Sequence, residues 1–577
     1  MTSSQIIVLA TPVFLLLIGL EFALGRARGR QTYRLADAVT SIGLGMLSQV
    51  SAVFTRLLRI GIYTAVHGAL ALFPDAALWD HWSGWLLALV FYDFCYYWHH
   101  RLGHESAVFW AAHVVHHQSE DYNLSTALRQ TSSGALLGWL VYLPMAVAGV
   151  PPLQFAIVAL VDLLYQYWIH TQQIGRLGWF DRVFASPSNH RVHHAVNDAY
   201  LDRNYGGILI LWDRLFGTFI DEDPANPCIY GTRKPLRSWD PLWANLEVYW
   251  ALARDSWRTR HWGDKLRVWL KPPGWQPADL AARAPAPGFD VRNVRRFEPP
   301  MGAGLQWFSG LQFLALLSGV ALYLWHAEGW PMARSAVWFA VLLTGLWAVG
   351  AAMQGRLLPL EVLVIEAGAL SMATAADGWH EAHLFFKPAA MVLALWLVAQ
   401  AWRAGGLPRA AALWLSLALA GSLAGDVALM LPGLFVPGLA SFLVAHLAYI
   451  VLFRQDSRWW PDRRMLLVCL GYAVLMVAVL WTGGLPAGLR LPVSVYALAI
   501  GLMAAQAVGR ARAHREQGST LVALGAIAFI ASDTLLAINR FVSPLPASAV
   551  WVLSTYYAAQ CLIVGGTLRR ARRSSTG

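Results

Sequence analysis

Apolar stretches recur along almost the whole chain, and most are long enough to cross a bilayer. A bilayer core requires roughly 20 apolar residues per helix. Segments near this length begin around residues 6, 38, 82, 131 and 152, and the last two would form a hairpin around Pro151-Pro152. After a long polar interval, about ten further apolar runs follow between residues 305 and 566. The pattern predicts an all-α polytopic membrane protein with about fifteen spans.

Composition and charge sharpen this prediction. Hydrophobic residues make up 57% of the chain and charged residues 13%, whereas a soluble domain carries about a quarter charged residues. This balance excludes an ordinary cytosolic enzyme. Most of the 44 Lys and Arg residues lie in alternate stretches between spans, so we expect that side, with the C-terminus, to be cytoplasmic. The net charge of +11 then reflects topology, and we expect a multi-pass protein of the bacterial inner membrane with no nucleic-acid partner.

The polar interval divides the chain into two membrane regions. Residues 171–304 are basic and rich in Trp and Pro, and they contain no apolar run of spanning length. Within them, residues 233–275 alternate Arg or Lys with Trp, which is typical of an amphipathic layer at the lipid headgroups. We therefore predict one domain over 1–304, two connecting spans over 305–353, and a second membrane domain over 354–577 with about eight spans.

Histidines are concentrated in three short arrays on the predicted cytoplasmic side. Residues three or four apart share one face of a helix, so each array can present two or three imidazoles to one point. Eight imidazoles exceed the four ligands that one zinc usually takes, and their number indicates a two-metal site. Imidazole suits iron, copper, nickel and zinc, so the ligand type does not choose the metal. The arrays are His100 and His104, then His113, His116 and His117, and then His190, His193 and His194.

Three further polar residues lie near these arrays. His170 follows the fifth apolar segment, at the right depth to be a ninth ligand. Asp93 and Asp162 lie within the segments that precede His100 and His170. Either carboxylate could hydrogen-bond the second ring nitrogen of a ligand, or could instead fill a polar gap between helices.

The arrays and the motifs around them resemble the fatty acid hydroxylase/sterol desaturase superfamily, and within it the alkylglycerol monooxygenase branch. The matching stretches are 168–171, 174–178, Ser186-Pro187-Ser188-Asn189-His190-Arg191-Val192-His193-His194, Asn204-Tyr205-Gly206-Gly207, 211–219, 241–245 and 272–275. At Asn189, relatives often carry another histidine. The resemblance implies a histidine-box helical bundle that holds two iron ions and uses O2 to hydroxylate or desaturate a lipid chain.

In the alkylglycerol branch, the hydroxylated carbon lies next to an ether oxygen, and the hemiacetal then collapses to an aldehyde and a glycerol derivative. That branch draws electrons from tetrahydrobiopterin. The chain carries neither a cytochrome b5-like HPGG segment nor a flavin fingerprint. We therefore expect an external reductant, either tetrahydrobiopterin or an electron-transfer protein, and a membrane lipid as the substrate.

The second membrane region places ionisable residues inside apolar segments, where they are costly and are functional candidates by default. Asp426 and Asp533 occupy similar settings, each between small and apolar residues, and Lys387 and His446 lie in other segments. Two carboxylates in one low-dielectric pocket could serve as one acid and one base. Alternatively, they could pair with Lys387 or cap buried polar groups.

This region resembles the lysoplasmalogenase-like YhhN family. The matching residues are Phe386-Lys387-Pro388, Gly425-Asp426, Phe442 with His446 and Tyr449, Ser532-Asp533, and Tyr557 with Gln560, Leu562 and Ile563. The resemblance implies an eight-helix transmembrane bundle that hydrolyses the vinyl-ether bond of lysoplasmalogens. It also implies that Asp426 and Asp533 are the acid/base pair and that His446 supports them.

These observations favour a fused enzyme that releases aldehydes from ether-type lipids. One alternative is a sterol, fatty acid or carotenoid hydroxylase or desaturase whose C-terminal bundle only handles lipid. A second alternative, of a different class, is a non-catalytic metal-binding scaffold or transporter, in which the intramembrane Asp and His residues line an ion path. Metal content and O2 consumption separate these hypotheses.

Overall fold

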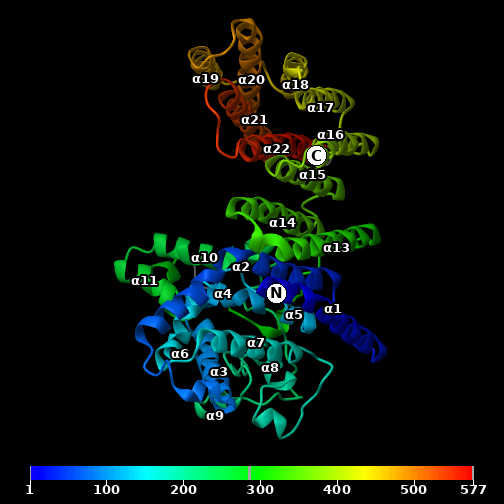
Figure 1. Ribbon diagram of the computed structural model, residues 1–577. Coiled ribbons are helices and arrows are strands. Elements are labelled where there is room, and N and C mark those ends of the chain that lie inside the picture. Colours follow the sequence, from blue (N-terminus) through cyan, green and yellow to red (C-terminus); the bar gives the residue numbers. More distant parts are fainter. Residues whose placement is uncertain (1, 284–287, 575–577) are drawn as a thin grey trace. The chain divides into compact units, whose positions relative to one another are not determined.

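The computed structural model describes residues 2–283 and 288–574. Over this range the chain is helical, and its β-structure consists of two isolated bridges, Phe184 with Leu209 and Ala195 with Tyr230 (Figure 1). The chain forms two compact units. Unit 1 comprises Met1–Trp330 and Val349–Arg356, and unit 2 comprises Pro331–Ala348 and Leu357–Gly577. The last three residues of the predicted cytoplasmic C-terminus lie outside the described range.

Unit 1 contains long apolar helices and many short ones. Its core near α3 includes Tyr63 and Phe155, whose rings stack 4.0 Å apart. The helices are α1 (Ser3–Ala27), α2 (Leu35–Leu70), α3 (Trp82–Glu105), α4 (Ala107–His117), α5 (Leu124–Ala127), α6 (Leu143–Ala148), α7 (Pro152–Trp168), α8 (Pro187–His193), α9 (Leu211–Leu215), α10 (Pro241–Arg258), α11 (Trp262–Leu270), α12 (Ala278–Ala281) and α13 (Ala303–His326), with α14 (Met332–Met353) shared with unit 2.

Twelve of the described helices are long and apolar enough to cross a membrane, so the prediction of an all-α polytopic membrane protein is confirmed. Three predicted spans, those beginning near residues 82, 131 and 152, are not among the twelve. The stretch 131–150 folds as a short 3-10 helix, Gly138–Tyr142, followed by the six-residue α6. Gly149, at φ +97°, ends α6 in a left-handed conformation that glycine adopts readily. The apolar length of 131–150 therefore predicted a continuous spanning helix where the structure has two short ones.

Besides most of α14, unit 2 contains eight long helices in sequence over residues 359–574, the number predicted for its bundle. Consecutive helices pack as hairpins around a large apolar core. Gly425 in α17 allows one of these close approaches, because a Cβ atom there would lie 2.5 Å from the ring of Phe442 in α18. The helices are α15 (Pro359–Ala376), α16 (His380–Arg403), α17 (Arg409–Met430), α18 (Phe435–Arg454), α19 (Arg463–Thr482), α20 (Ala487–His514), α21 (Gln517–Phe541) and α22 (Ser548–Ser574).

Candidate functional site

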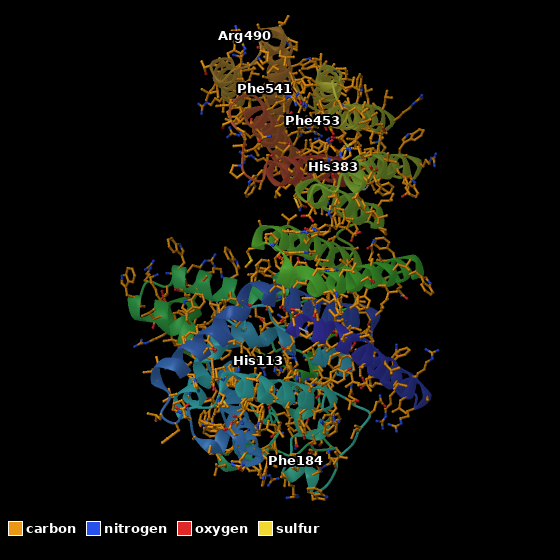
Figure 2. All side chains as sticks on the ribbon, in the orientation of Figure 1. His113, Phe184, His383, Phe453, Arg490 and Phe541 are labelled. Carbon is orange, nitrogen blue, oxygen red and sulfur yellow. The ribbon has the colours of Figure 1, made fainter. Side chains whose placement is uncertain are left out.

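The nine predicted histidine ligands lie together in unit 1, in two groups. Within each group the candidate ligand atoms all lie within 4.8 Å of one another. The side chains come from α3, α4, the end of α7 and α8, and His113 is labelled in Figure 2. Group A consists of His100, His104, His113, His117 and His193, and group B consists of His116, His170, His190 and His194.

Each HxxHH array contributes to both groups, which sequence reasoning did not foresee. In α4, His113 and His117 face group A and His116 faces group B. In and just after α8, His190 and His194 face group B, while His193 faces group A. Residues i and i+4 are about 40° apart around a helix axis, whereas the residue at i+3 lies about 60° to the other side. One HxxHH array can therefore supply ligands to both groups.

The ring nitrogens approach one another as ligands of a common ion would. Nε2 of His113 lies 3.1 Å from Nε2 of His100 and 3.0 Å from Nε2 of His117. In group B, Nε2 of His170 lies 3.1 Å from that of His116 and 3.0 Å from that of His190. A metal–nitrogen bond of about 2.1 Å places neighbouring octahedral ligands about 3.0 Å apart. The spacing fits direct coordination.

Backbone carbonyls decide which ring nitrogen carries the proton. A carbonyl oxygen only accepts hydrogen bonds, so each Nδ1 that contacts one must be protonated, and the Nε2 lone pair then points into the group. This is how ligand imidazoles are usually oriented. The four bonds run from Nδ1 of His100 to Tyr205 O (2.8 Å), of His116 to Arg129 O (3.0 Å), of His170 to Gln166 O (2.7 Å), and of His193 to Arg203 O (3.0 Å).

Facing lone pairs cannot hydrogen-bond one another, and two of the nitrogens have no other partner. Nε2 of His104 and Nε2 of His194 are buried without a hydrogen-bond partner among the described residues. An unpaired buried polar atom costs free energy, and a bound cation removes that cost by accepting every lone pair. The donor set therefore fits one metal ion in each group.

Burial keeps eight of the nine imidazoles neutral at pH 7. Removal from water, reinforced by neighbouring histidines, lowers the pKa of seven of them well below the usual 6.5, namely His100, His113, His117, His170, His190, His193 and His194. Burial lowers the pKa of His116 to about 4. Neutral imidazole is the form that binds metal.

The loop 202–206 supplies two of the orienting carbonyls. Asp202 (φ +56°) and Asn204 (φ +57°) adopt the left-handed conformation, which Asp and Asn tolerate better than most residues. The Asn204 side chain donates to the carbonyls of Asn189 (3.1 Å) and Ile220 (2.9 Å). The buried Asp213 carboxylate accepts from the N–H of Tyr205 at 2.8 Å. The loop thereby aims its carbonyls at His193 and His100.

Asp93 and Asp162 do not orient the histidines. The Asp93 carboxylate accepts hydrogen bonds from the backbone of Ile208 (2.7 Å) and Leu209 (3.0 Å) and from the Trp212 ring (2.8 Å). Asp162 accepts from Gln166, whose backbone carbonyl meets His170. Asp93 therefore does not hydrogen-bond a ligand histidine. It satisfies polar groups of the loop that follows Tyr205, in line with the interpretation that these carboxylates fill polar gaps.

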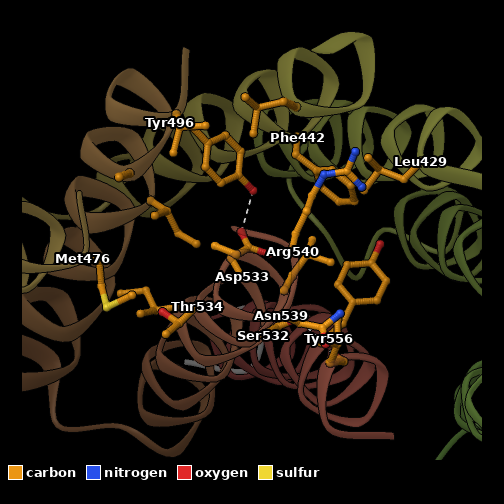
Figure 3. Close-up of a pocket in the computed structure, with 18 of the residues that line it drawn as sticks. Leu429, Phe442, Met476, Tyr496, Ser532, Asp533, Thr534, Asn539, Arg540 and Tyr556 are labelled. Carbon is orange, nitrogen blue, oxygen red and sulfur yellow. Dashed lines mark hydrogen bonds between the residues drawn. The ribbon is translucent and has the colours of Figure 1, made fainter. Parts of the chain in front are cut away.

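A cavity of about 320 Å³ lies in unit 2 and contains the two predicted carboxylates (Figure 3). Both Asp426 and Asp533 line it, as does Lys387, while His446 is fully buried behind Tyr496. The remaining walls are mainly apolar. The structure therefore brings the four ionisable residues into one region, although they come from four different helices.

Two tyrosines that sequence reasoning missed hold the carboxylates. The Tyr556 hydroxyl donates to Asp426 at 2.6 Å, and Lys387 Nζ lies 3.4 Å from the same carboxylate. The Tyr496 hydroxyl donates to Asp533 at 2.5 Å, and His446 Nε2 lies 2.9 Å from that hydroxyl. Because the Tyr496 hydroxyl donates its hydrogen bond to Asp533, the hydroxyl oxygen accepts a hydrogen bond from His446 Nε2. Asp426 thus both lines the cavity and pairs with Lys387.

Two family models match the chain, one in each unit. The fatty acid hydroxylase model matches residues 85–218, which include all nine histidines, and the YhhN family model matches residues 382–567. No solved structure gives a significant match.

Curated relatives follow the same division. An alkylglycerol monooxygenase of Xenopus tropicalis is 36% identical over 320 residues, which cover 55% of this chain and 70% of the relative. The alkylglycerol monooxygenase of Homo sapiens is 39% identical over 46% of this chain and 59% of its own length. The lysoplasmalogenase TMEM86B of Sus scrofa is 38% identical over 25% of this chain, and the match spans 59% of that relative.

Proposed function

The chain belongs to the alkylglycerol monooxygenase family, and we propose that its first unit is a di-iron, O2-dependent monooxygenase that acts on alkyl-ether lipids. The observation that carries this proposal is the pair of buried histidine groups, within which His116 and His170, both protonated at Nδ1 by their carbonyl partners, face each other with unprotonated Nε2 atoms 3.1 Å apart. Nine imidazoles and no thiolate suit a first-row metal such as iron. The similarity to alkylglycerol monooxygenases supports the ether substrate.

The proposed reaction converts an alkyl ether R–CH2–O–R′, O2, two electrons and two protons to an aldehyde, the alcohol R′–OH and water. Iron would supply the activation of O2 and the insertion of one oxygen atom into the C–H bond beside the ether oxygen. The protein holds the ligands in one tautomer through the carbonyls of Arg129, Gln166, Arg203 and Tyr205. Burial of the imidazoles excludes water from the reacting atoms.

The helices α10 and α11 support a position at the membrane surface. They pack against α4, which carries three of the histidines. Trp250, Trp257 and Trp262 are 62%, 86% and 82% exposed, and Arg and Lys residues lie close to them in the sequence. Exposed Trp with basic neighbours is typical of helices that lie at lipid headgroups. We propose that this layer, on the cytoplasmic side, admits lipid and an external reductant to the metal centre.

Metal analysis tests the first activity. We expect purified protein to contain about two iron ions per chain, one for each histidine group, and to consume O2 when given alkylglycerol and a reductant. His193→Ala should lose both iron and turnover. His261→Ala is the matched control, because His261 is an exposed histidine of the same unit that precedes α11. Metal-free, inactive wild-type protein would favour the scaffold or transporter hypothesis.

We further propose that the cavity of unit 2 hydrolyses a vinyl-ether lipid, converting R–CH=CH–O–R′ and water to R–CH2–CHO and R′–OH. The acid must protonate the vinyl carbon, and the base must accept a proton from water. Lys387 Nζ lies 3.4 Å from Asp426, and a neighbouring cation favours the ionised form that the base role needs. Asp533 is suited to the acid role, because the Tyr496–His446 pair can return a proton to it. The YhhN match and the TMEM86B similarity support this reaction.

Lipid mass spectrometry on membranes supplied with alkylglycerol and lysoplasmalogen tests both halves together. His193→Ala should abolish only aldehyde release from alkylglycerol. Asp426→Asn should abolish only aldehyde release from lysoplasmalogen. Turnover of alkylglycerol without turnover of lysoplasmalogen by wild-type protein would favour the alternative in which the C-terminal bundle only handles lipid.

A further inference from the structure

The cavity of unit 2 reaches the surface where three helix ends meet. Its lining includes Phe435 at the start of α18, Arg540 and Phe541 at the end of α21, and Ser548 at the start of α22. Arg540 lines the cavity and is also exposed. The cavity therefore has a mouth at Arg540 and a polar floor at Asp426 and Asp533.

Arg540 is a cation held in place without a carboxylate. Its guanidinium carbon lies 4.2 Å from the ring centroid of Phe435 and 5.8 Å from that of Phe541. Among the described residues no Asp or Glu forms an ion pair with it. Stacking on aromatic rings fixes a guanidinium while leaving its N–H groups free, and their planar arrangement matches phosphate oxygens.

The spacing between Arg540 and the floor suits a glycerol phosphate. Asp533 and Arg540 are seven residues apart on α21, so they lie on one face, about 10.5 Å apart along the axis. Both are drawn around the cavity in Figure 3. In a glycerol phosphate, five bonds separate the phosphorus from the ether oxygen at the far carbon, roughly 6 Å when extended. This leaves room for a hydrogen bond at each end.

We propose that Arg540 binds the phosphate of a single-chain glycerophospholipid and so fixes which end of the lipid reaches the two carboxylates. At the floor the Lys387 ammonium is already paired with Asp426, whereas the guanidinium at the mouth has no carboxylate partner among the described residues and attracts a phosphate. Apolar side chains such as Met476 and Leu480 face the hydrocarbon chain. The inference rests on the proposed hydrolase function for the identity of the bond at the floor, but phosphate binding is measurable without any hydrolysis.

The test compares binding of two ligands that carry no vinyl ether. Full-length protein in nanodiscs is titrated with 1-palmitoyl-lysophosphatidylcholine and with the neutral 1-palmitoylglycerol. Arg540→Gln should weaken binding of the phospholipid about tenfold or more, because a charge-assisted hydrogen bond is lost, and should change binding of the neutral lipid less than twofold. Arg540→Lys should recover part of the loss. Arg490→Gln is the control, because Arg490 is also exposed and lies 5.3 Å from the Trp481 ring, yet does not line the cavity.

Other results overturn the proposal. Equal losses for both lipids would mean that Arg540 only maintains the shape of the mouth, and no loss for either would mean that it contacts neither. If inorganic phosphate binds wild-type protein but not Arg540→Gln, and the phospholipid binds both equally, the site takes a free anion. The proposed hydrolase fails separately: wild-type protein that binds the phospholipid through Arg540 but does not cleave lysoplasmalogen would contradict the reaction and leave the binding intact.

Discussion

The histidine groups of unit 1 and the carboxylates of unit 2 are both buried polar clusters, but they are satisfied in different ways. In unit 1 backbone carbonyls hold the ring protons of four histidines on the outer side, so the Nε2 lone pairs of His116 and His170 face each other 3.1 Å apart. Two facing lone pairs cannot hydrogen-bond each other, whereas a bound cation would accept both. In unit 2 each carboxylate already has a tyrosine donor, and Lys387 supplies a positive charge for Asp426. The first arrangement fits a bound metal ion, whereas in the second each carboxylate has hydrogen-bond partners within the protein.

The largest expected effect comes from removing a ligand. His193→Ala should lower O2-dependent turnover by roughly three orders of magnitude or more, because group A loses a nitrogen that lies 3.2 Å from Nε2 of His117. Hydrolysis in unit 2 should be unchanged. Iron content and O2 uptake provide the measurement. Full activity of His193→Ala would contradict the view that group A holds a metal ion through this histidine.

The corresponding change in unit 2 is smaller. Asp533→Asn keeps the shape of the cavity but removes the proton carrier, so hydrolysis of lysoplasmalogen should fall about 100- to 10,000-fold. Monooxygenase turnover should persist. Tyr472→Phe is a matched control, because Tyr472 also lines the cavity but its hydroxyl contacts Thr534 rather than a carboxylate. Equal effects of both substitutions would argue against a proton-transfer role for Asp533.

Acidification should destabilise the metal-free histidine cluster of unit 1 without any mutation. The pKa of His116 is about 4 in the folded state and the usual 6.5 when unfolded, so the unfolded chain binds protons first as pH falls. The contribution of His116 to the stability of the metal-free protein should be constant above pH 6.5 and decline below it, by roughly 3 kcal/mol at pH 4. Thermal unfolding between pH 7.5 and 5 measures this, and a rise in unfolding temperature over that interval would contradict it.

The smallest effect concerns the support of the ligands. Asn204→Gly retains the left-handed backbone but loses the side-chain bonds to Asn189 and Ile220. We expect metal affinity to fall about 10- to 100-fold, as is usual when the groups that orient ligands are disturbed. Competition with a chelator measures the affinity. Asp202→Gly is a useful comparison, because it changes the other left-handed residue of the loop. An unchanged metal affinity in both variants would mean that the loop does not orient His193 and His100.

Much of the fold was predictable because apolar length is a local property. The eight helices of unit 2 follow directly from eight apolar runs. Between residues 131 and 150 the same reasoning failed, because the apolar run folds as a 3-10 helix and the six-residue α6, which ends at Gly149. The histidine spacing likewise indicated which imidazoles gather. It did not indicate that Tyr496 and Tyr556 hold the carboxylates, because an isolated Tyr in an apolar helix carries no signal of its partner.

The sequence by itself determined that the chain is a membrane-spanning helical protein, that nine histidines are available as ligands, and that two carboxylates lie within apolar helices. These are consequences of composition and of spacing within single helices. Only the tertiary structure decided how each HxxHH array is shared between two groups and which nitrogen faces inward. It also decided that Arg540 stands at the mouth above Asp533. Those features depend on backbone carbonyls and on contacts between residues far apart in the chain, which no local pattern encodes.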